Sequence, residues 1–204
     1  MINPIILTDC DGVLLNWRDA FASWMLRHGK EEKHRNGYSM GQSFEISEDE
    51  AELCIEIFNE SAAIRYMEPL EESQKYVNLL YHRGYRLRVI TSLSGDEIAS
   101  KARLHNLQDV YGKHAIEGLH CLSCGKSKRE TLEKCANEFE GLTTFWIEDH
   151  QINAKHGQDL GFETIVKAYN YNESFEGTRL ETWKEIYEKI LEIENTSKQI
   201  LEFL

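Results

Sequence analysis

The segment from Pro4 to Leu15, PIILTDCDGVLL, is the feature that most restricts how this chain can fold. Its apolar run, residues 5–7, has the composition of a short buried strand, and polar side chains follow at once. Asp9 and Asp11 therefore come just after the carboxyl end of a strand, where ligands bind in an open α/β sheet. Gly12 allows a tight backbone turn beside them. Because two close carboxylates repel each other, the arrangement favours a hard cation such as Mg²⁺ at this point.

The D-x-D-G pattern also has a simpler interpretation, a strand that ends in an Asp-Gly turn at a solvated edge. The pattern alone does not separate these two interpretations. A calcium loop of the EF-hand type begins with D-x-D as well, but it needs a glycine at its sixth position and more oxygen ligands in phase. Val13 and Leu14 occupy the fifth and sixth positions here, which excludes that loop.

Length and charge limit the class of protein. A chain of 204 residues can bury about 70% of its unfolded surface, enough for one core with an insertion. The net charge of -12 argues against a nucleic-acid polymer or an anionic membrane as partner. A small phosphorylated metabolite stays compatible if a local cationic site exists. The first residues lack the basic and apolar regions of a signal peptide, and no stretch has the length of a membrane span, so we expect a cytoplasmic protein.

The cysteines do not form an evident framework. They are odd in number and irregularly spaced, at positions 10, 54, 121, 124 and 135. Cys121-x-x-Cys124 has the spacing of a zinc or redox pair, and His114 and His120 are near, but no second pair accompanies it. We interpret this segment as a loop with two incidental thiols, with a zinc site as the less favoured alternative.

Strand-like and helix-like segments alternate along the chain. Strands are expected at residues 5–7, 85–90, 115–121, 143–147 and 163–166. The alternation predicts a doubly wound, Rossmann-like parallel sheet of about five strands. A helix through Ile98, Ala102 and Leu107 follows the second strand, and Ser-x-x-Glu or Thr-x-x-Glu capping boxes at 127–130 and 182–185 begin two more helices.

The segment between the first strand and Pro69 reads differently. Residues 17–28 have the apolar spacing of an amphipathic helix, 29–46 are polar and read as a loop, and a capping box at 47–50 opens a second helix. We therefore expect residues 16–68 to form a small helical cap, and residues 1–15 and 69–204 to form the core.

Reactive side chains follow several of the expected strands. All carboxyl ends of a parallel sheet lie on one edge, so these side chains can meet in one cleft although they are distant in sequence. The candidates are Asp9, Asp11, Thr91, Ser92, Lys126, Lys128, Glu148 and Asp149. Acids that hold a cation, an ammonium group and a hydroxyl together suit a phosphoryl group.

This combination resembles the haloacid dehalogenase-like superfamily over nearly the whole chain. The first motif of that superfamily, an apolar strand followed by D-x-D-G, matches IILTDCDGV. Its second motif, a strand that ends in Thr or Ser, matches RVITS, and its third is a lysine ahead of a helix. Its fourth, an acidic pair with a later Asp or Asn, matches WIEDHQIN, with Asn153 in the trailing position.

The resemblance implies a role for each matching residue. Asp9 is the nucleophile that becomes a phospho-aspartate, and Asp11 is the general acid and base. Mg²⁺ is held by a carboxylate oxygen of Asp9, the backbone carbonyl of Asp11, and Asp149. Thr91 binds the phosphoryl oxygens, with Ser92 as the neighbouring possibility.

Two points stay open within the resemblance. For the site lysine we prefer Lys128, since it stands next to a helix start, with Lys126 as the alternative. Glu148 stands where the superfamily more often has Asp or Gly, so either Glu148 or Asp149 could dominate metal binding. In having a valine after D-x-D-G, Val13, the chain resembles the branch of 5'-nucleotidases and deoxyribonucleotidases with small helical caps.

Substrate contacts are expected from the cap. Gly12, in the loop beside the nucleophile, is a further candidate for substrate binding. Trp17, Tyr38, Phe44 and Arg65 could stack on a nucleotide or neutralise it. Each also has a structural interpretation: Trp17 as a core residue of its helix, and Arg65 as a solvated surface residue. The segment Tyr169-Asn170-Tyr171 either borders the site or only shapes its loop.

The sequence thus predicts a magnesium-dependent phosphomonoester hydrolase, most specifically a 5'-nucleotidase-like enzyme acting on a nucleoside monophosphate. The alternatives are a phosphatase of a sugar or another small metabolite, and a non-catalytic binding module with the same fold. The presence of both Asp9 and Asp11 weighs against the binding module. The oligomeric state is left open.

Overall fold

A parallel sheet of six strands forms the centre of the computed structural model, which describes residues 4–35, 39–140, 142 and 144–203. The strand order is β3-β2-β1-β4-β5-β6, and each neighbouring pair is parallel. The strands are β1 (Ile5–Thr8), β2 (Arg86–Ser92), β3 (Ile116–Leu122), β4 (Phe145–Glu148), β5 (Glu163–Lys167) and β6 (Thr178–Leu180). The doubly wound sheet is confirmed, with one strand more than the five expected.

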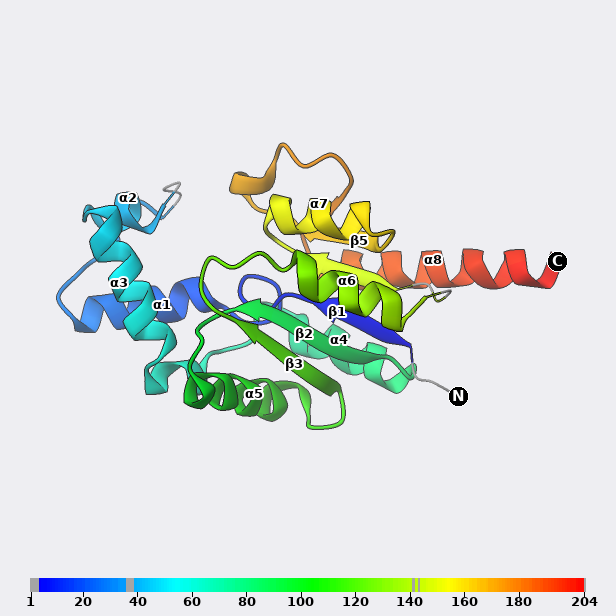
Figure 1. The fold of residues 1–204 in the computed structure, drawn as a ribbon, viewed down its shortest axis with the longest axis horizontal. Coiled ribbons are helices and arrows are strands. Elements are labelled where there is room, and N and C mark those ends of the chain that lie inside the picture. The colour runs from blue at the N-terminus through cyan, green and yellow to red at the C-terminus, as the bar shows by residue number, and fades with distance from the viewer. Residues whose placement is uncertain (1–3, 36–38, 141, 143, 204) are drawn as a thin grey trace.

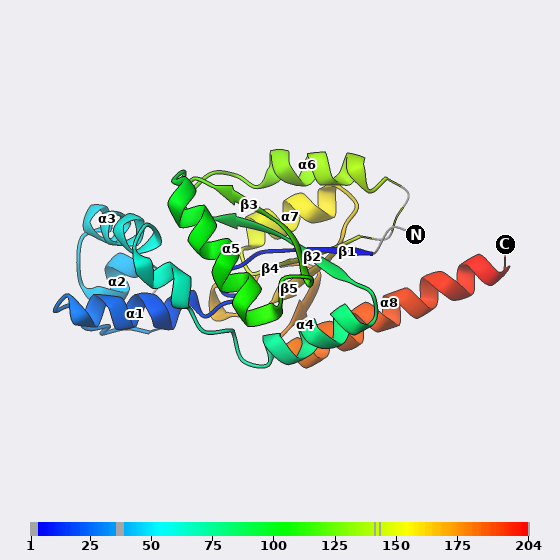
Figure 2. The same cartoon turned by 90° about the horizontal axis from the view of Figure 1, so that it is seen from below.

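Helices cover both faces of this sheet (Figure 2). One face is packed by α4 (Ser73–His82), α5 (Glu97–Tyr111) and α8 (Trp183–Phe203), and the other by α6 (Arg129–Glu138) and α7 (Gln151–Asp159). A large apolar cluster fills the first face and a smaller one, which includes Leu7, Leu132 and Trp146, fills the second. Because both faces of β1 and β4 are buried, these strands are continuous apolar runs.

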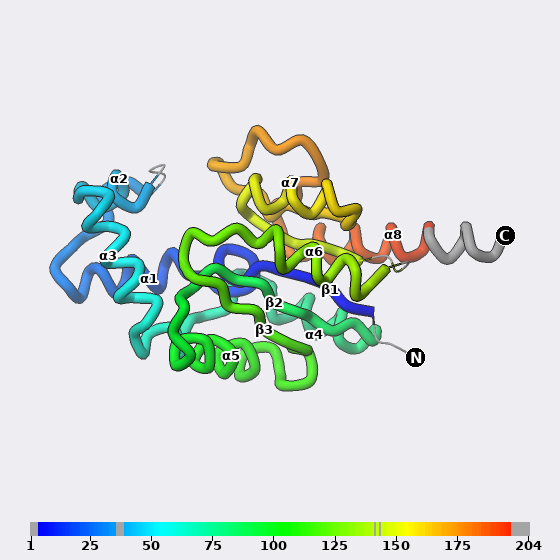
Figure 3. The backbone as a smooth tube through the Cα atoms, viewed as in Figure 1, coloured from blue at the N-terminus to red at the C-terminus, as the bar shows by residue number. Residues whose placement is uncertain are grey.

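The cap helices lie together beside the end of the sheet from which β1 leads into α1 (Figure 1). They are α1 (Trp17–Arg27), α2 (Met40–Phe44), α3 (Glu48–Asn59) and the 3₁₀ helix η1 (Ala62–Tyr66). The tube in Figure 3 follows the chain out of β1, through these helices and back to α4. These helices come from the segment for which a cap was predicted, and both the cap and its boundaries at 16 and 68 stay a prediction.

Three details of the expected elements were wrong. The segment 29–46 contains α2, because the Ser39 side chain accepts a hydrogen bond from the Gln42 amide and caps a short helix. On α5, Leu107 is buried as its place in the apolar pattern indicates, but Ile98 is 75% exposed and Ala99 lies on the buried face in its place. The capping box at Ser127 does not form: α6 begins at Arg129 with Lys128 as its N-cap.

Other expected elements agree with the structure. Ser47 caps α3 through the Glu50 amide, and Thr182 and Glu185 form the reciprocal bonds of a capping box before α8. The fourth strand begins at Phe145 among the described residues, and Thr143 lies outside them. None of the helices in the described part of the chain is long and apolar enough to cross a membrane.

Asn59, the last residue of α3, connects the cap to the core. It is 2% exposed and accepts a hydrogen bond from the Trp17 indole N–H at 2.9 Å. Its side-chain amide donates to the Leu93 carbonyl, just after β2, at 3.0 Å. One buried amide therefore ties two cap helices to the loop that follows a site strand.

Candidate active site

The turn after β1 presents both acids of the first motif. The Cys10 carbonyl accepts hydrogen bonds from the amides of Leu14 at 2.8 Å and Leu15 at 2.9 Å, which closes the turn. Gly12 adopts a φ of +77°, a conformation that costs L-residues about 1 kcal/mol or more. Asp9 and Asp11 consequently leave the sheet edge toward the same cavity.

Asp9 is held in place by contacts from three directions. Its own amide donates to the Ile147 carbonyl of β4 at 2.8 Å, since β1 and β4 are neighbours. Its Oδ1 accepts the Cys10 amide at 2.6 Å and lies 2.7 Å from Nζ of Lys128. Asp9 as a residue is only 6% exposed. These contacts and this burial fix the orientation of its carboxylate before any ligand arrives.

Lys128 joins the third and fourth motifs. Its Nζ lies 2.9 Å from Oε2 of Glu148, and both side chains are buried. Burial lowers the pKa of Lys128, but the carboxylates of Asp9 and Glu148 raise it by more, so the ammonium stays charged. Of the two lysines that the sequence left open, Lys128 is the one in contact with the acids.

Both carboxylate oxygens of Glu148 already have hydrogen-bond partners within the protein. While Oε2 binds Lys128, Oε1 accepts the backbone amides of Asp149 at 3.1 Å and His150 at 3.0 Å. A carboxylate with an ammonium partner and two amide donors has little capacity left for a metal ion. The geometry thus favours Asp149 over Glu148 as the ligand from this motif.

Three carboxylates, from Asp9, Glu148 and Asp149, have oxygens within 4.8 Å of one another. Burial, and then the charge of Glu148, raises the pKa of Asp9 well above its ordinary value, although Lys128 opposes this. Desolvation and the charge of Asp9 raise the pKa of Asp149 to about 6. Such an excess of buried acid is relieved by a hard cation with oxygen ligands, so these residues fit Mg²⁺.

Two stacked tyrosines after β5 border this acidic cluster. The rings of Tyr169 and Tyr171 have centroids 5.2 Å apart and planes inclined by 10°. Tyr171 donates its hydroxyl to Oδ2 of Asp149, and Tyr169 donates to the Gly12 carbonyl at 2.8 Å. A Cβ on Gly12 would lie 2.5 Å from the same Oδ2, so only glycine leaves room for Asp149.

The remaining predicted residues line one cavity of about 480 Å³ with these acids. Thr91 is 1% exposed, and its hydroxyl finds no hydrogen-bond partner among the described residues. Ser92 donates to the Lys126 carbonyl at 3.2 Å, which fastens the loop before α6 to the end of β2. The Lys126 side chain is exposed at the cavity edge.

Arg103 of α5 is a site residue that the sequence reasoning missed. It is 0% exposed, and its Nη1 pairs with Oδ1 of Asp11 and donates to Sγ of Cys10 at 2.8 Å. A signal was available: Arg103 lies four residues after Ala99 and four before Leu107, on the apolar face of the helix.

The structure does not bring the candidate substrate residues of the cap to this cavity. Trp17 stacks on Phe21 with centroids 4.7 Å apart, and Arg65 pairs with Asp109 of α5. Phe44 is 5% exposed and packs edge-on against Phe21. Tyr38 lies outside the described residues.

The Cys121 and Cys124 pair shows no metal-site character in the described residues. Neither thiol belongs to the acidic three-residue cluster, which contains Asp9, Glu148 and Asp149. Burial raises the pKa of both thiols, so both are held in the protonated form, which binds metals poorly.

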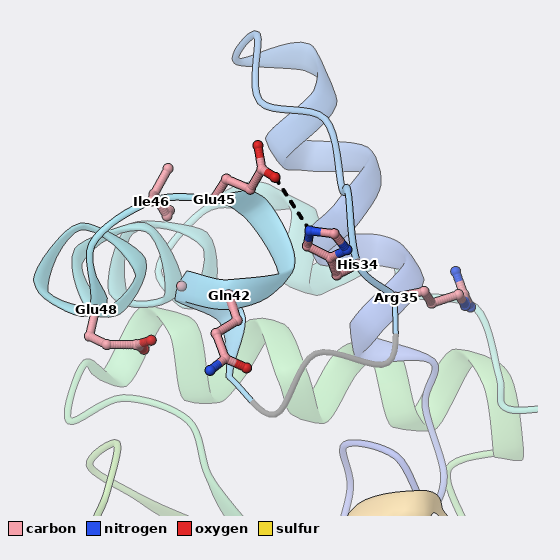
Figure 4. Close-up of a pocket in the computed structure, with 7 residues that line it drawn as sticks. His34, Arg35, Gln42, Glu45, Ile46 and Glu48 are labelled. Carbon is pink, nitrogen blue, oxygen red and sulfur yellow. Dashed lines mark hydrogen bonds and ion pairs between the residues drawn. The ribbon is translucent and has the colours of Figure 1, made fainter.

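A separate hollow lies within the cap (Figure 4). It lies among α2, the start of α3 and the segment that carries His34 and Arg35. His34 and Glu45 face each other there, with Nε2 and Oε1 3.3 Å apart. This hollow shares no lining residue with the cavity at Asp9.

The chain matches no protein-family model. It is 24% identical over 199 residues to an uncharacterized 32.4 kDa protein of enterobacteria phage T4, an alignment that covers 93% of this chain and 70% of the phage protein.

Solved structures with a similar fold span nearly the whole chain. A haloacid dehalogenase-like hydrolase from Streptococcus pneumoniae has a TM-score of 0.64 at 13% identity, covering 92% of this chain and 98% of its own. A heptose 1,7-bisphosphate phosphatase from B. bronchiseptica, in complex with magnesium and phosphate, has a TM-score of 0.61 at 12% identity, with coverage of 93% and 98%.

A putative phosphoglycolate phosphatase from Lactobacillus delbrueckii has a TM-score of 0.63 at 12% identity, with coverage of 92% and 98%. The parallel sheet and these structural matches agree with each other. The chain has the fold of the haloacid dehalogenase-like hydrolases.

Proposed function

We propose that this protein is a magnesium-dependent phosphomonoester hydrolase that works through a phospho-aspartate on Asp9. The observation that carries the proposal is the convergence of three groups in one cavity: the Asp9 carboxylate, the Lys128 ammonium bound to it, and the unpartnered Thr91 hydroxyl. A phosphoryl group offers what each of them needs, because it is an electrophile, an anion and a hydrogen-bond acceptor.

The residues divide the reaction between them. The Asp9 carboxylate attacks phosphorus, the bond from phosphorus to the ester oxygen breaks, and Asp11 gives its proton to the departing oxygen. Asp11 then takes a proton from water as that water attacks phosphorus, which releases phosphate and restores Asp9. Lys128 and Thr91 stabilise the charge on the equatorial oxygens throughout.

Asp9, Asp149 and the backbone carbonyl of Asp11 would hold the magnesium ion. When bound, the ion supplies positive charge that offsets both the carboxylates and the phosphate. Lys128 also reduces the repulsion between the carboxylates, because its ammonium pairs with both Asp9 and Glu148. The preference for Asp149 over Glu148 rests on the hydrogen bonds that Glu148 already makes.

For the substrate we propose a small phosphorylated metabolite, with a nucleoside monophosphate as the first candidate on the strength of the D-x-D-G-V motif. A sugar phosphate is the second candidate, since a protein of this fold is named a heptose bisphosphate phosphatase. Because Trp17 and Arg65 have partners within the protein, neither is part of the proposed contact surface. The cytoplasmic location stays an expectation from the sequence.

Phosphate release from nucleoside monophosphates, sugar phosphates and an aryl phosphate tests the proposal, with wild type and Asp9→Asn compared in Mg²⁺ and in EDTA. We expect release by the wild type in Mg²⁺, and none from Asp9→Asn or after chelation. Release confined to nucleotides would fix the substrate class. Activity of Asp9→Asn, or activity that survives exhaustive chelation, would contradict the nucleophile or the metal.

A further inference from the structure

We propose that Arg103 is a positioning residue that fixes the orientation of Asp11 for proton transfer, an inference that rests on the proposed function. Arg103 reaches the site from α5, on the sheet face opposite α6 and α7, and does not line the cavity itself. Its Nη1 pairs with Oδ1 of Asp11, the residue assigned as general acid and base.

The burial of Arg103 is costly for the fold. Its side chain is 0% exposed, whereas that of Asp11 is 22% exposed, so the arginine is desolvated far more than its partner. Its Nε and Nη2 atoms have no hydrogen-bond partner among the described residues. A buried guanidinium with two unpaired donors is a poor way to stabilise a helix face, where an apolar side chain of similar size does better. A role at the site accounts for this cost.

The contact geometry shows how Arg103 acts on Asp11. Nη1 holds Oδ1, while Oδ2 of Asp11 has no hydrogen bond from the described residues. The carboxylate is thereby held at one oxygen, and Asp11 lines the cavity with its side chain 22% exposed. Oδ2 is then the atom that delivers the proton to the leaving oxygen and later accepts one from water.

Cys10 provides an internal control for this contact. The same Nη1 donates to Cys10 Sγ, which lies between the two acids in sequence. Cys10→Ala removes the thiol contact but leaves the ion pair with Asp11. If the ion pair with Asp11 is what matters, Cys10→Ala should have a smaller kinetic effect than removal of the Arg103 guanidinium.

The experiment compares an alkyl phosphate from the panel above with 4-nitrophenyl phosphate. Protonation of the leaving oxygen matters for the alkyl ester, whereas the nitrophenolate leaves readily without it. Arg103→Met should lower kcat/KM for the alkyl phosphate by about 10- to 100-fold, and should raise the aryl-to-alkyl ratio of kcat/KM as Asp11→Asn does, because kcat/KM reports transfer to Asp9 and not the later hydrolysis that both substrates share. Cys10→Ala should keep the wild-type ratio.

A double-mutant cycle separates this role from a general structural one. The Asp11→Asn/Arg103→Met protein should be about as slow as Asp11→Asn alone, since Arg103 acts through Asp11. If Arg103→Met does not fold, Arg103→Lys keeps a buried cation and should show a smaller shift of the ratio in the same direction.

The inference is overturned if the losses in kcat/KM multiply in the double variant, or if kcat/KM falls equally for both substrates in the Arg103 variant that folds. An active wild type with no leaving-group effect in Asp11→Asn would instead refute the acid role of Asp11. No phosphate release from the wild type would refute the proposed function, and the role of Arg103 with it.

Discussion

At the scale of single residues, local sequence was enough to predict most residues of the candidate site. Asp9, Asp11 and Asp149 stand directly after apolar strands, so their common edge follows from the parallel sheet. The apolar spacing of α5 could have marked Arg103 as a buried residue, but not its contact with Asp11, which is 92 positions away. The choice between Lys126 and Lys128 also needed the structure, since both precede the same helix.

The buried triad of Lys128, Asp9 and Glu148 leads to a stability prediction. Lys128→Met leaves two buried carboxylates without their cation, which should lower the free energy of unfolding by about 3–5 kcal/mol in metal-free protein. Urea unfolding at pH 7 measures this. Lys126→Met, an exposed neighbour, is the matched control and should stay within about 0.5 kcal/mol of wild type.

Equal effects of the two lysine substitutions would contradict the structural role given to Lys128. Adding Glu148→Gln to Lys128→Met should recover part of the loss, because the double variant no longer buries the Glu148 charge.

At the scale of elements, strands and long helices were predictable and short elements were not. Runs such as 86–92 and 163–167 carry enough apolar residues to define a strand. By contrast, β6 has three residues, all partly exposed, and α2 has five. Neither is long enough to show a period, so tertiary contacts rather than local pattern decide their conformation. The capping box predicted at Ser127 was wrong: Ser127 Oγ accepts the amide of Arg129, and Lys128 is the N-cap of α6.

The hydrogen bonds of Asn59 join the cap to the core, so we predict that its side chain contributes to the free energy of unfolding. Asn59→Ala removes the acceptor of the Trp17 indole and leaves the Leu93 carbonyl without its donor. We expect a loss of about 1–3 kcal/mol in the free energy of unfolding by urea. Glu56→Ala, exposed on the same helix, should change it by less than about 0.5 kcal/mol. A loss no greater than that of the control would show that this link contributes little.

At the scale of the whole molecule, an acidic protein with a net charge of -12 concentrates buried acids at one edge of its sheet. The sequence composition argued against a polyanionic partner, but it could not show that one ammonium, that of Lys128, balances the cluster from within. The cation that balances the other side is the proposed Mg²⁺, and its binding should depend on pH.

The pKa of Asp149, raised by desolvation and by Asp9 to about 6, sets the direction of that dependence. Its ordinary value is about 3.9, so the folded, metal-free protein keeps this proton up to pH 6 and loses stability as pH rises through that value. Magnesium must displace the proton at pH 5 but not at pH 7.5. The rise in Tm on adding Mg²⁺ should therefore be larger at pH 7.5 than at pH 5. Equal rises at both pH values, or none, would contradict this.

The covalent intermediate is the central claim, and trapping it is the most direct test. Wild type and Asp9→Asn would be quenched during turnover with borohydride, which reduces an aspartyl phosphate to homoserine, and the modified residue would be located by peptide mass spectrometry. Our account predicts homoserine at position 9 in the wild type and nowhere in Asp9→Asn. Phosphate release with Asp9 unmodified, or a trapped residue elsewhere in the chain, would contradict it.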